Sequence, residues 1–174
     1  MDQNQGLHLD VVASTLQDFS AVEIQRENSG YRAVHVRGQH IATTAELFTE
    51  FAAAFQFPWY FGQNWAAFDE CMRDLDEWLP PGTQGYALAV WNADTVLVKD
   101  KSALEAFVDS LNFIHQELAE PSGLVSTGTG TGVASPTPRG FQVVLHCEPG
   151  AHDRLLSRWT HAGARLNPPA AAHL

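Results

Sequence analysis

The spacing of apolar residues predicts strands in the first part of the chain. Residues 21–26 (AVEIQR) and 31–37 (YRAVHVR) alternate apolar and polar positions, which is typical of half-buried strands. Residues 28–30 (Asn-Ser-Gly) between them have the composition of a turn, so we expect a hairpin or two edge strands here. Upstream, the apolar residues of 7–19 alternate at first and take a loosely helical spacing from residue 12.

Helical spacing dominates further along the chain. Thr43 and Glu46 form a capping-box pattern, and the apolar residues of 44–55 then lie on one helical face. A second amphipathic stretch, 103–118, follows Ser102, which is a good N-cap residue. Two helices are therefore predicted, each with one face for burial.

Two apolar runs predict buried strands. Residues 86–91 (YALAVW) have no polar face, which favours a central strand of a parallel sheet covered by helices. Residues 141–147 (FQVVLHC) are expected to form the last core strand, with a short helix after it over about 151–162. Strands that alternate with helices in this way favour parallel pairing, so the fold class is α/β.

Residues 57–75, FPWYFGQNWAAFDECMRDL, combine a shaped loop with a helix. Pro58 disfavours helical geometry just before it, and Gly62 tolerates backbone angles that other residues resist. Asn64 is a good N-cap for the helix that follows. Apolar residues at spacings of three and four mark the buried face of this helix, and they are Trp65, Phe68, Met72 and Leu75.

The other face of this helix is mainly acidic. Its residues are Ala66, Asp69, Glu70, Arg73, Asp74 and Glu77. Carboxylates in the last turn oppose the helix dipole, so the stability of the helix does not explain Asp74, Asp76 and Glu77. Either they form a solvated face of an acidic protein, or they belong to a binding surface. The rings of residues 59–61 beside them either pack into the core or anchor a partner.

The order of residues within 57–75 resembles the signature of the barstar-like family of ribonuclease inhibitors. The matching positions, some identical and some like-for-like, are Phe57, Pro58, Tyr60, Phe61, Gly62, Asn64, Trp65, Ala67, Phe68, Glu70, Cys71 and Met72. Element order extends the resemblance over roughly residues 31–147. The resemblance implies three parallel strands with packed helices, and an acidic helix that enters a basic nuclease cleft in place of substrate phosphates.

Two positions depart from the family pattern. Family members usually carry an aspartate at the position of Ala66, and an aspartate also stands where this chain has Glu70. Both family carboxylates are associated with blocking the nuclease active site. The partner-binding residues that the resemblance implies here are Tyr60, Gly62, Asn64, Ala66, Asp69, Glu70, Arg73 and Asp74. Two further hypotheses are an immunity protein for a different toxin and an interaction module without a nuclease partner.

The expected architecture is an α/β, barstar-like two-layer fold with a three-stranded parallel sheet and packed helices. We expect residues 1–30 to be an N-terminal extension, 31–147 the barstar-like domain, and 148–174 a C-terminal extension. Residues 121–140 are rich in Gly, Ser, Thr and Pro and have no apolar period, which predicts a flexible insertion within the domain.

Charge restricts the classes of partner. Twenty acidic residues against ten basic ones give the 174-residue chain a formal charge of -10, which repels phosphate backbones and anionic lipid surfaces. The expected partner is a basic ribonuclease or toxin, with no nucleic acid and no membrane, and the free protein is expected to be a monomer. No segment approaches the roughly 18 apolar residues that span a bilayer, and the N-terminus lacks signal-peptide features, so a cytoplasmic location is expected.

Catalytic motifs are absent from the sequence. The eight histidines show no HxxxH or HxH spacing, so no metal and no cofactor is expected. No GxSxG motif occurs, and Cys71 and Cys147 are expected to be reduced thiols. An enzyme that uses the acidic cluster for proton transfer is a third hypothesis, but carboxylates along an exposed face are well hydrated. We expect no catalytic residue.

Overall fold

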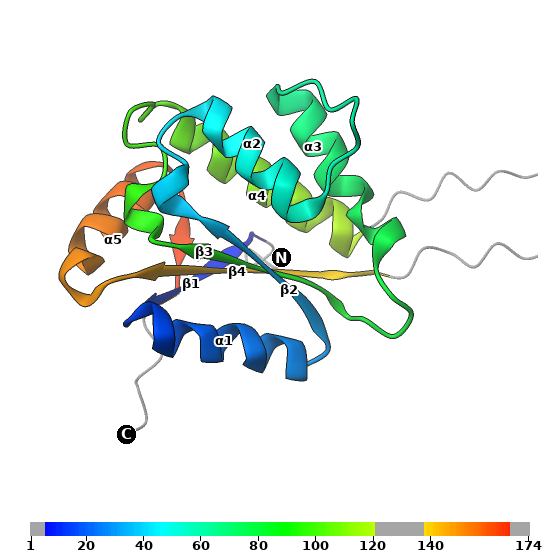
Figure 1. Ribbon diagram of the computed structural model, residues 1–174, viewed down its shortest axis with the longest axis horizontal. Coiled ribbons are helices and arrows are strands. Elements are labelled where there is room, and N and C mark those ends of the chain that lie inside the picture. Colours follow the sequence, from blue (N-terminus) through cyan, green and yellow to red (C-terminus); the bar gives the residue numbers. More distant parts are fainter. Residues whose placement is uncertain (1–5, 121–137, 168–174) are drawn as a thin grey trace, which may run out of the picture.

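The computed structural model describes residues 6–120 and 138–167, which form a parallel five-stranded sheet flanked by helices (Figure 1). The strands are β1 (His8–Ala13), β2 (Tyr31–Arg37), β3 (Gly85–Trp91), β4 (Gly140–Cys147) and β5 (Arg165–Leu166). Their order across the sheet is β2-β3-β4-β1-β5, and every neighbouring pair is parallel. The predicted α/β class with a parallel sheet is confirmed.

The number of strands and layers differs from the expectation. The sheet has five strands and not three, because β1 pairs with β4 from Leu9 to Ala13 and β5 adds a short edge to β1. Helices cover both faces of the sheet, so the arrangement has more than two layers (Figure 1). Strand β1 carries apolar side chains that are buried in the main core, since Leu9 and Val11 are each only 2% exposed. An alternating run near the start of a chain does not reveal which strand it will pair with.

The helices are α1 (Leu16–Asn28), α2 (Thr44–Phe55), α3 (Trp65–Arg73), α4 (Ala103–Ala119) and α5 (His152–His161). In Figure 1, α1 lies below the sheet, and α2, α3 and α4 lie above it. Short 3-10 turns follow β2 (Gly38–His40), α3 (Asp74–Trp78, called η2), β3 (Ala93–Thr95) and β4 (Pro149–Ala151). The loop between α2 and α3 therefore lies on the same side of the sheet as these two helices.

The predicted strand over 21–26 is wrong, because these residues belong to α1. Thr15 caps this helix, its hydroxyl oxygen accepting a hydrogen bond from the backbone N–H of Asp18. Phe19 is fully buried under the sheet, whereas Ile24 is 57% exposed. The alternation through Ile24 was therefore not a burial pattern, and the helix is held by the contact of Phe19 with β3 and β4.

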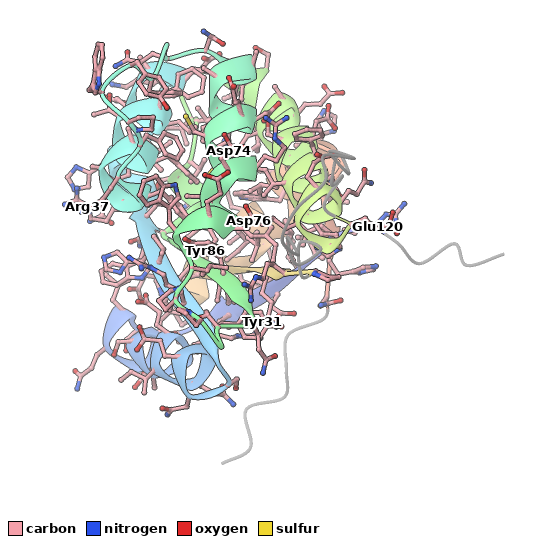
Figure 2. All side chains as sticks on the ribbon, turned by 90° about the vertical axis from the view of Figure 1, so that its right-hand side faces the viewer. Tyr31, Arg37, Asp74, Asp76, Tyr86 and Glu120 are labelled. Atoms are coloured by element: carbon pink, nitrogen blue, oxygen red, sulfur yellow. The ribbon has the colours of Figure 1, made fainter. Side chains whose placement is uncertain are left out.

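Strand β2 forms one edge of the described sheet. It begins at Tyr31 and ends at Arg37, both labelled in Figure 2, and pairs along its whole length with β3. Strand β3 pairs with β2 on one side and β4 on the other, so the prediction that 86–91 is a central strand is confirmed. The five residues from Tyr86 to Val90 are all buried.

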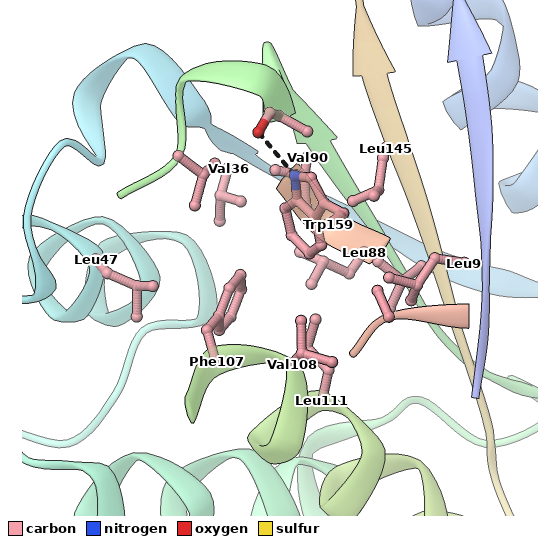
Figure 3. Close-up of a cluster of buried hydrophobic side chains, with 14 of the residues drawn as sticks. Leu9, Val36, Leu47, Leu88, Val90, Phe107, Val108, Leu111, Leu145 and Trp159 are labelled. Carbon is pink, nitrogen blue, oxygen red and sulfur yellow. Dashed lines mark hydrogen bonds between the residues drawn. The ribbon is translucent and has the colours of Figure 1, made fainter. Parts of the chain in front are cut away.

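The main core lies between the sheet and the upper helices (Figure 3). Phe107 of α4 meets Trp159 of α5 with ring centroids 6.0 Å apart, and Leu88 and Leu145 supply the sheet side. The indole N–H of Trp159 donates a hydrogen bond of 3.0 Å to the carbonyl of Ala93. Burial of this large ring therefore leaves no unpaired donor.

Several local predictions can be compared with the observed elements. The capping box of Thr43 and Glu46 is present, and the helix that it starts spans the predicted residues. Helix α4 also matches, but Ser102 does not cap it, because its backbone is already helical and its hydroxyl makes no cap hydrogen bond. The helix expected over 151–162 is α5. Of the predicted insertion 121–140, residues 121–137 lie outside the described residues, and Gly140 already belongs to β4.

Candidate functional site

The loop between α2 and α3 has a defined backbone path. Gln56 ends α2 in the left-handed region, with φ at 54°, and the N–H of Phe57 returns to the carbonyl of Ala52 at 2.9 Å. The N–H of Phe61 donates to the carbonyl of Pro58 at 3.0 Å, which closes a turn. Hydrogen bonds therefore fix both ends of the aromatic segment.

Asn64 links this loop to α3. Its Oδ1 accepts a hydrogen bond of 2.9 Å from the N–H of Ala67, as an N-cap side chain does. Its Nδ2 donates to the carbonyl of Gly62 at 3.2 Å. The capping prediction is confirmed, and the same side chain also holds the loop against the first turn of the helix.

The aromatic residues of the loop divide into two groups. Phe57 and Phe61 turn inward and pack edge-to-face with centroids 5.0 Å apart, and Phe61 also meets Phe48 of α2. Trp59 is 95% exposed and Tyr60 is 70% exposed. Packing into the core thus applies to Phe61, while Trp59 and Tyr60 present their rings to solvent.

Helix α3 buries the predicted face. Phe68 and Met72 are fully buried, and Phe68 packs edge-to-face against Phe51 and Trp65. Leu75, one turn further on, is 4% exposed and lies in η2. The helical part ends at Arg73, so Asp74 begins a tighter turn that redirects the chain before Pro80.

A groove of about 510 Å³ lies between this loop, α3, η2 and the start of β2. Phe55, Phe57 and Tyr86 are among the apolar residues that line it, and the acidic side chains of Glu70, Asp74 and Glu77 line it as well. Figure 2 shows Asp74 and Asp76 above Tyr86 on the side of the molecule that faces the viewer. The groove thus combines an apolar lining with carboxylates.

The chain matches a known protein family. A family model described as "Barstar (barnase inhibitor)" matches residues 31–126, which is more than half of the chain.

The chain belongs to the barstar family.

The matched segment begins at β2, so β1 and α1 precede it. Members of the barstar family are non-enzymatic inhibitors, and this chain is accordingly a binding protein and not an enzyme. A comparison with curated proteins found no match.

The structure brings together four of the eight residues that the barstar-like resemblance implied. Tyr60, Gly62, Glu70 and Asp74 all line the groove. The remaining four, Asn64, Ala66, Asp69 and Arg73, do not line it.

Those four residues have other surroundings. Asn64 is the N-cap, and Ala66 is exposed in the first turn of α3. Asp69 is half-buried, and its Oδ1 is shielded from solvent with no hydrogen-bond partner among the described atoms. Arg73 is exposed and forms an ion pair of 3.3 Å with Asp74. Of the eight residues, those that line the groove come from the aromatic loop, from α3 and from the start of η2.

The predicted set omitted most of the groove residues, among them Glu77, Trp78 and Arg32. Glu77 and Trp78 belong to η2, which continues the chain beyond the predicted helix, and Arg32 comes from β2. The acidic run that includes Glu77 was a usable signal in the sequence. Trp78 gave a weaker signal, because the sequence does not show that its ring is 75% exposed and not buried. Arg32 could not be found without the sheet, which places β2 below the groove.

Two groove residues, Cys71 and Tyr86, have a raised pKa. Burial raises the pKa of the Cys71 thiol, and the charges of Glu70 and Asp74 raise it further. Burial also raises the pKa of Tyr86, whose hydroxyl donates a hydrogen bond of 3.1 Å to the carbonyl of Leu75. Both groups stay neutral at pH 7, so the charge of the groove comes from its carboxylates and Arg32.

Neither a metal site nor a membrane helix emerges from the described part of the chain. Within residues 6–120 and 138–167, no three His, Cys, Asp or Glu side chains are grouped so as to hold a metal ion. None of the helices in these same ranges has both the length and the apolar character required to cross a membrane. Cys71 and Cys147 are both free thiols.

Proposed function

We propose that this protein inhibits a basic ribonuclease of the barnase type by inserting α3 and the aromatic loop into the nuclease active-site cleft. The observation that carries the proposal is the joint position of Tyr60, Glu70 and Asp74 on one groove of a barstar-family chain. An inhibitor of this kind acts in the cytoplasm, where it protects the RNA of the cell that makes it.

Charge and shape support the proposal together. A nuclease cleft that binds phosphates is basic, and Glu70 and Asp74 offer carboxylates that take the place of those phosphates. Tyr60 is exposed over 70% of its surface and stands beside them, so it can be buried when a partner docks. Buried aromatic anchors often carry much of the free energy of an interface, while charged groups give orientation.

A second candidate rests on Ala66, which is exposed in the first turn of α3 and supplies no carboxylate. A toxin whose pocket does not need that carboxylate fits this surface as well as a ribonuclease does. The variant Ala66→Asp separates the two candidates. It tightens binding to a barnase-type ribonuclease, and it weakens or leaves unchanged the binding of a toxin adapted to alanine.

The experiment measures cleavage of an RNA substrate by a barnase-type ribonuclease as the inhibitor is added, with binding followed by surface plasmon resonance. Parent protein is expected to inhibit cleavage stoichiometrically. Glu70→Lys is expected to weaken binding by about 2–5 kcal/mol if the charge is paired and buried in the complex. Asp109→Lys is the matched control, since Asp109 is an exposed acid on α4 outside the groove.

Two results would count against the proposal. Failure of the parent protein to bind any barnase-type ribonuclease removes the ribonuclease as target. Equal binding by Glu70→Lys and the parent, with Asp109→Lys also unchanged, places the interface on another face. Circular dichroism of each variant shows whether the fold is kept, and substitutions at exposed helix positions usually change stability by within about 0.5 kcal/mol.

A further inference from the structure

Trp78 stands apart from the aromatic residues discussed so far. It lies in η2 and lines the same groove as Tyr60, yet its ring is 75% exposed. Most of this large indole therefore remains in contact with water, although it lines a groove. Such rings become stable anchors when a ligand covers them.

The charges around Trp78 select the kind of ligand. Three carboxylates, those of Glu70, Asp74 and Glu77, line the groove, against the one guanidinium of Arg32. Their excess of negative charge favours a cation. The apolar part of the lining, with Phe57, Leu75 and Tyr86, favours a long apolar stem attached to that cation.

We propose that the groove receives an arginine side chain of the protein partner, with its guanidinium stacked on Trp78 and hydrogen-bonded to Glu77. This inference rests on the proposed function and extends the interface along η2, from Asp74 to Glu77 and Trp78. Arginine fits better than lysine, because its planar guanidinium stacks on an indole and bonds a carboxylate through two N–H groups at once.

The Asp74 carboxylate is also available to an arginine side chain in the groove. Its partner in the free protein is Arg73, through a single contact of 3.3 Å between side chains that are 45% and 48% exposed. Exposed pairs of this kind contribute little to stability. An incoming guanidinium can therefore share the Asp74 carboxylate without breaking an interaction that the fold needs.

The first test uses a small probe and needs no partner protein. N-acetyl-arginine amide is titrated into the protein while the backbone amide signals of Gly62 and Leu75 are followed by NMR. A saturable shift is expected at both, with a smaller shift for Trp78→Ala or Glu77→Gln and none for the uncharged probe N-acetyl-norleucine amide. Trp59→Ala is the matched control, because Trp59 is exposed to 95% but does not line the groove. Absence of saturable shifts at Gly62 and Leu75, or equal shifts with the norleucine probe, overturns the inference.

The second test measures affinity for the barnase-type ribonuclease. Trp78→Ala and Glu77→Gln are each expected to lower affinity roughly tenfold, and Trp59→Ala less than twofold. Full affinity of both groove variants overturns the inference while leaving the proposed function intact. If the ribonuclease does not bind the parent at all but the arginine probe still saturates the groove, the proposed function fails and the groove's preference for arginine is upheld.

Discussion

Arg37 at the end of β2 and Glu50 on α2 are joined by three hydrogen bonds to one carboxylate. Arg37 Nε donates to Oε1 at 2.8 Å, Nη2 donates to Oε2 at 2.9 Å, and the backbone N–H of Arg37 donates to Oε1 at 3.0 Å. These bonds, the side-chain bonds first among them, lower the pKa of Glu50. The pair ties the edge strand to the helix that leads into the aromatic loop.

Glu50→Gln is expected to make the stability of the protein less sensitive to acid. Because the folded-state pKa of Glu50 lies below its ordinary value of 4.5, the carboxylate contributes stability above that pH, and the contribution is lost as pH falls through the lowered pKa. The variant should be less stable than the parent at pH 7, and the difference should shrink towards pH 3. Urea denaturation at both pH values measures the stability difference between variant and parent. A difference that is the same at pH 7 and pH 3 would contradict a lowered pKa of Glu50.

Asn64→Ala is expected to lower stability by about 1 kcal/mol, because the N–H of Ala67 loses its cap. Asn64→Ser keeps a capping oxygen and serves as the control, with a smaller loss expected. Thermal unfolding of the two variants gives the comparison. Equal stability of Asn64→Ala and the parent would show that the cap contributes nothing measurable. A stability loss without a change in partner affinity would assign Asn64 to holding the loop and not to contacting the partner.

The two thiols are expected to react at very different rates with iodoacetamide in the native protein. Cys71 is half-buried with a raised pKa, so alkylation is slow at pH 7 and speeds up with rising pH. Cys147 is fully buried, and burial first, then Asp94, raises its pKa to about 11, so it reacts after unfolding. Peptide mass mapping identifies the modified residue. Alkylation of Cys147 before Cys71 in the folded protein would contradict the structure.

Removal of residues 1–30 is expected to abolish cooperative folding. The deletion takes away β1, which lies between β4 and β5, and α1, whose Phe19 covers Ala89 and Val144. Loss of several buried side chains, each contributing roughly 2–5 kcal/mol, exceeds the total stability of an ordinary domain of about 5–15 kcal/mol.

Leu9→Ala provides the milder control for this deletion, with a loss of about 2–5 kcal/mol and the fold retained. Calorimetry and circular dichroism of both proteins measure the effect. A cooperative melt of the chain that starts at residue 31, close to the temperature of the parent, would show that β1 and α1 are accessory to the matched barstar segment.

The sequence by itself determined the elements whose signals are local. The capping box at Thr43, the N-cap at Asn64 and the apolar face of α3 each depend on residues a few positions apart, and all three are present in the structure. The apolar run of β3 likewise predicted its central place, because a strand with no polar face must be covered on both sides. The order of residues in 57–75 was specific enough to indicate the family.

The tertiary structure decided everything that depends on distant segments. Pairing of Leu9 with Val143 made β1 an inner strand, although the two residues are far apart in sequence. The α1 region was misjudged for the same reason, since Phe19 finds its partners only on β3 and β4. The groove depends on the sheet placing Arg32 in its lining, and on the packing that leaves Trp78 exposed. Periodicity records which side chains can be buried, but the surface that remains open is set by how the packed elements meet.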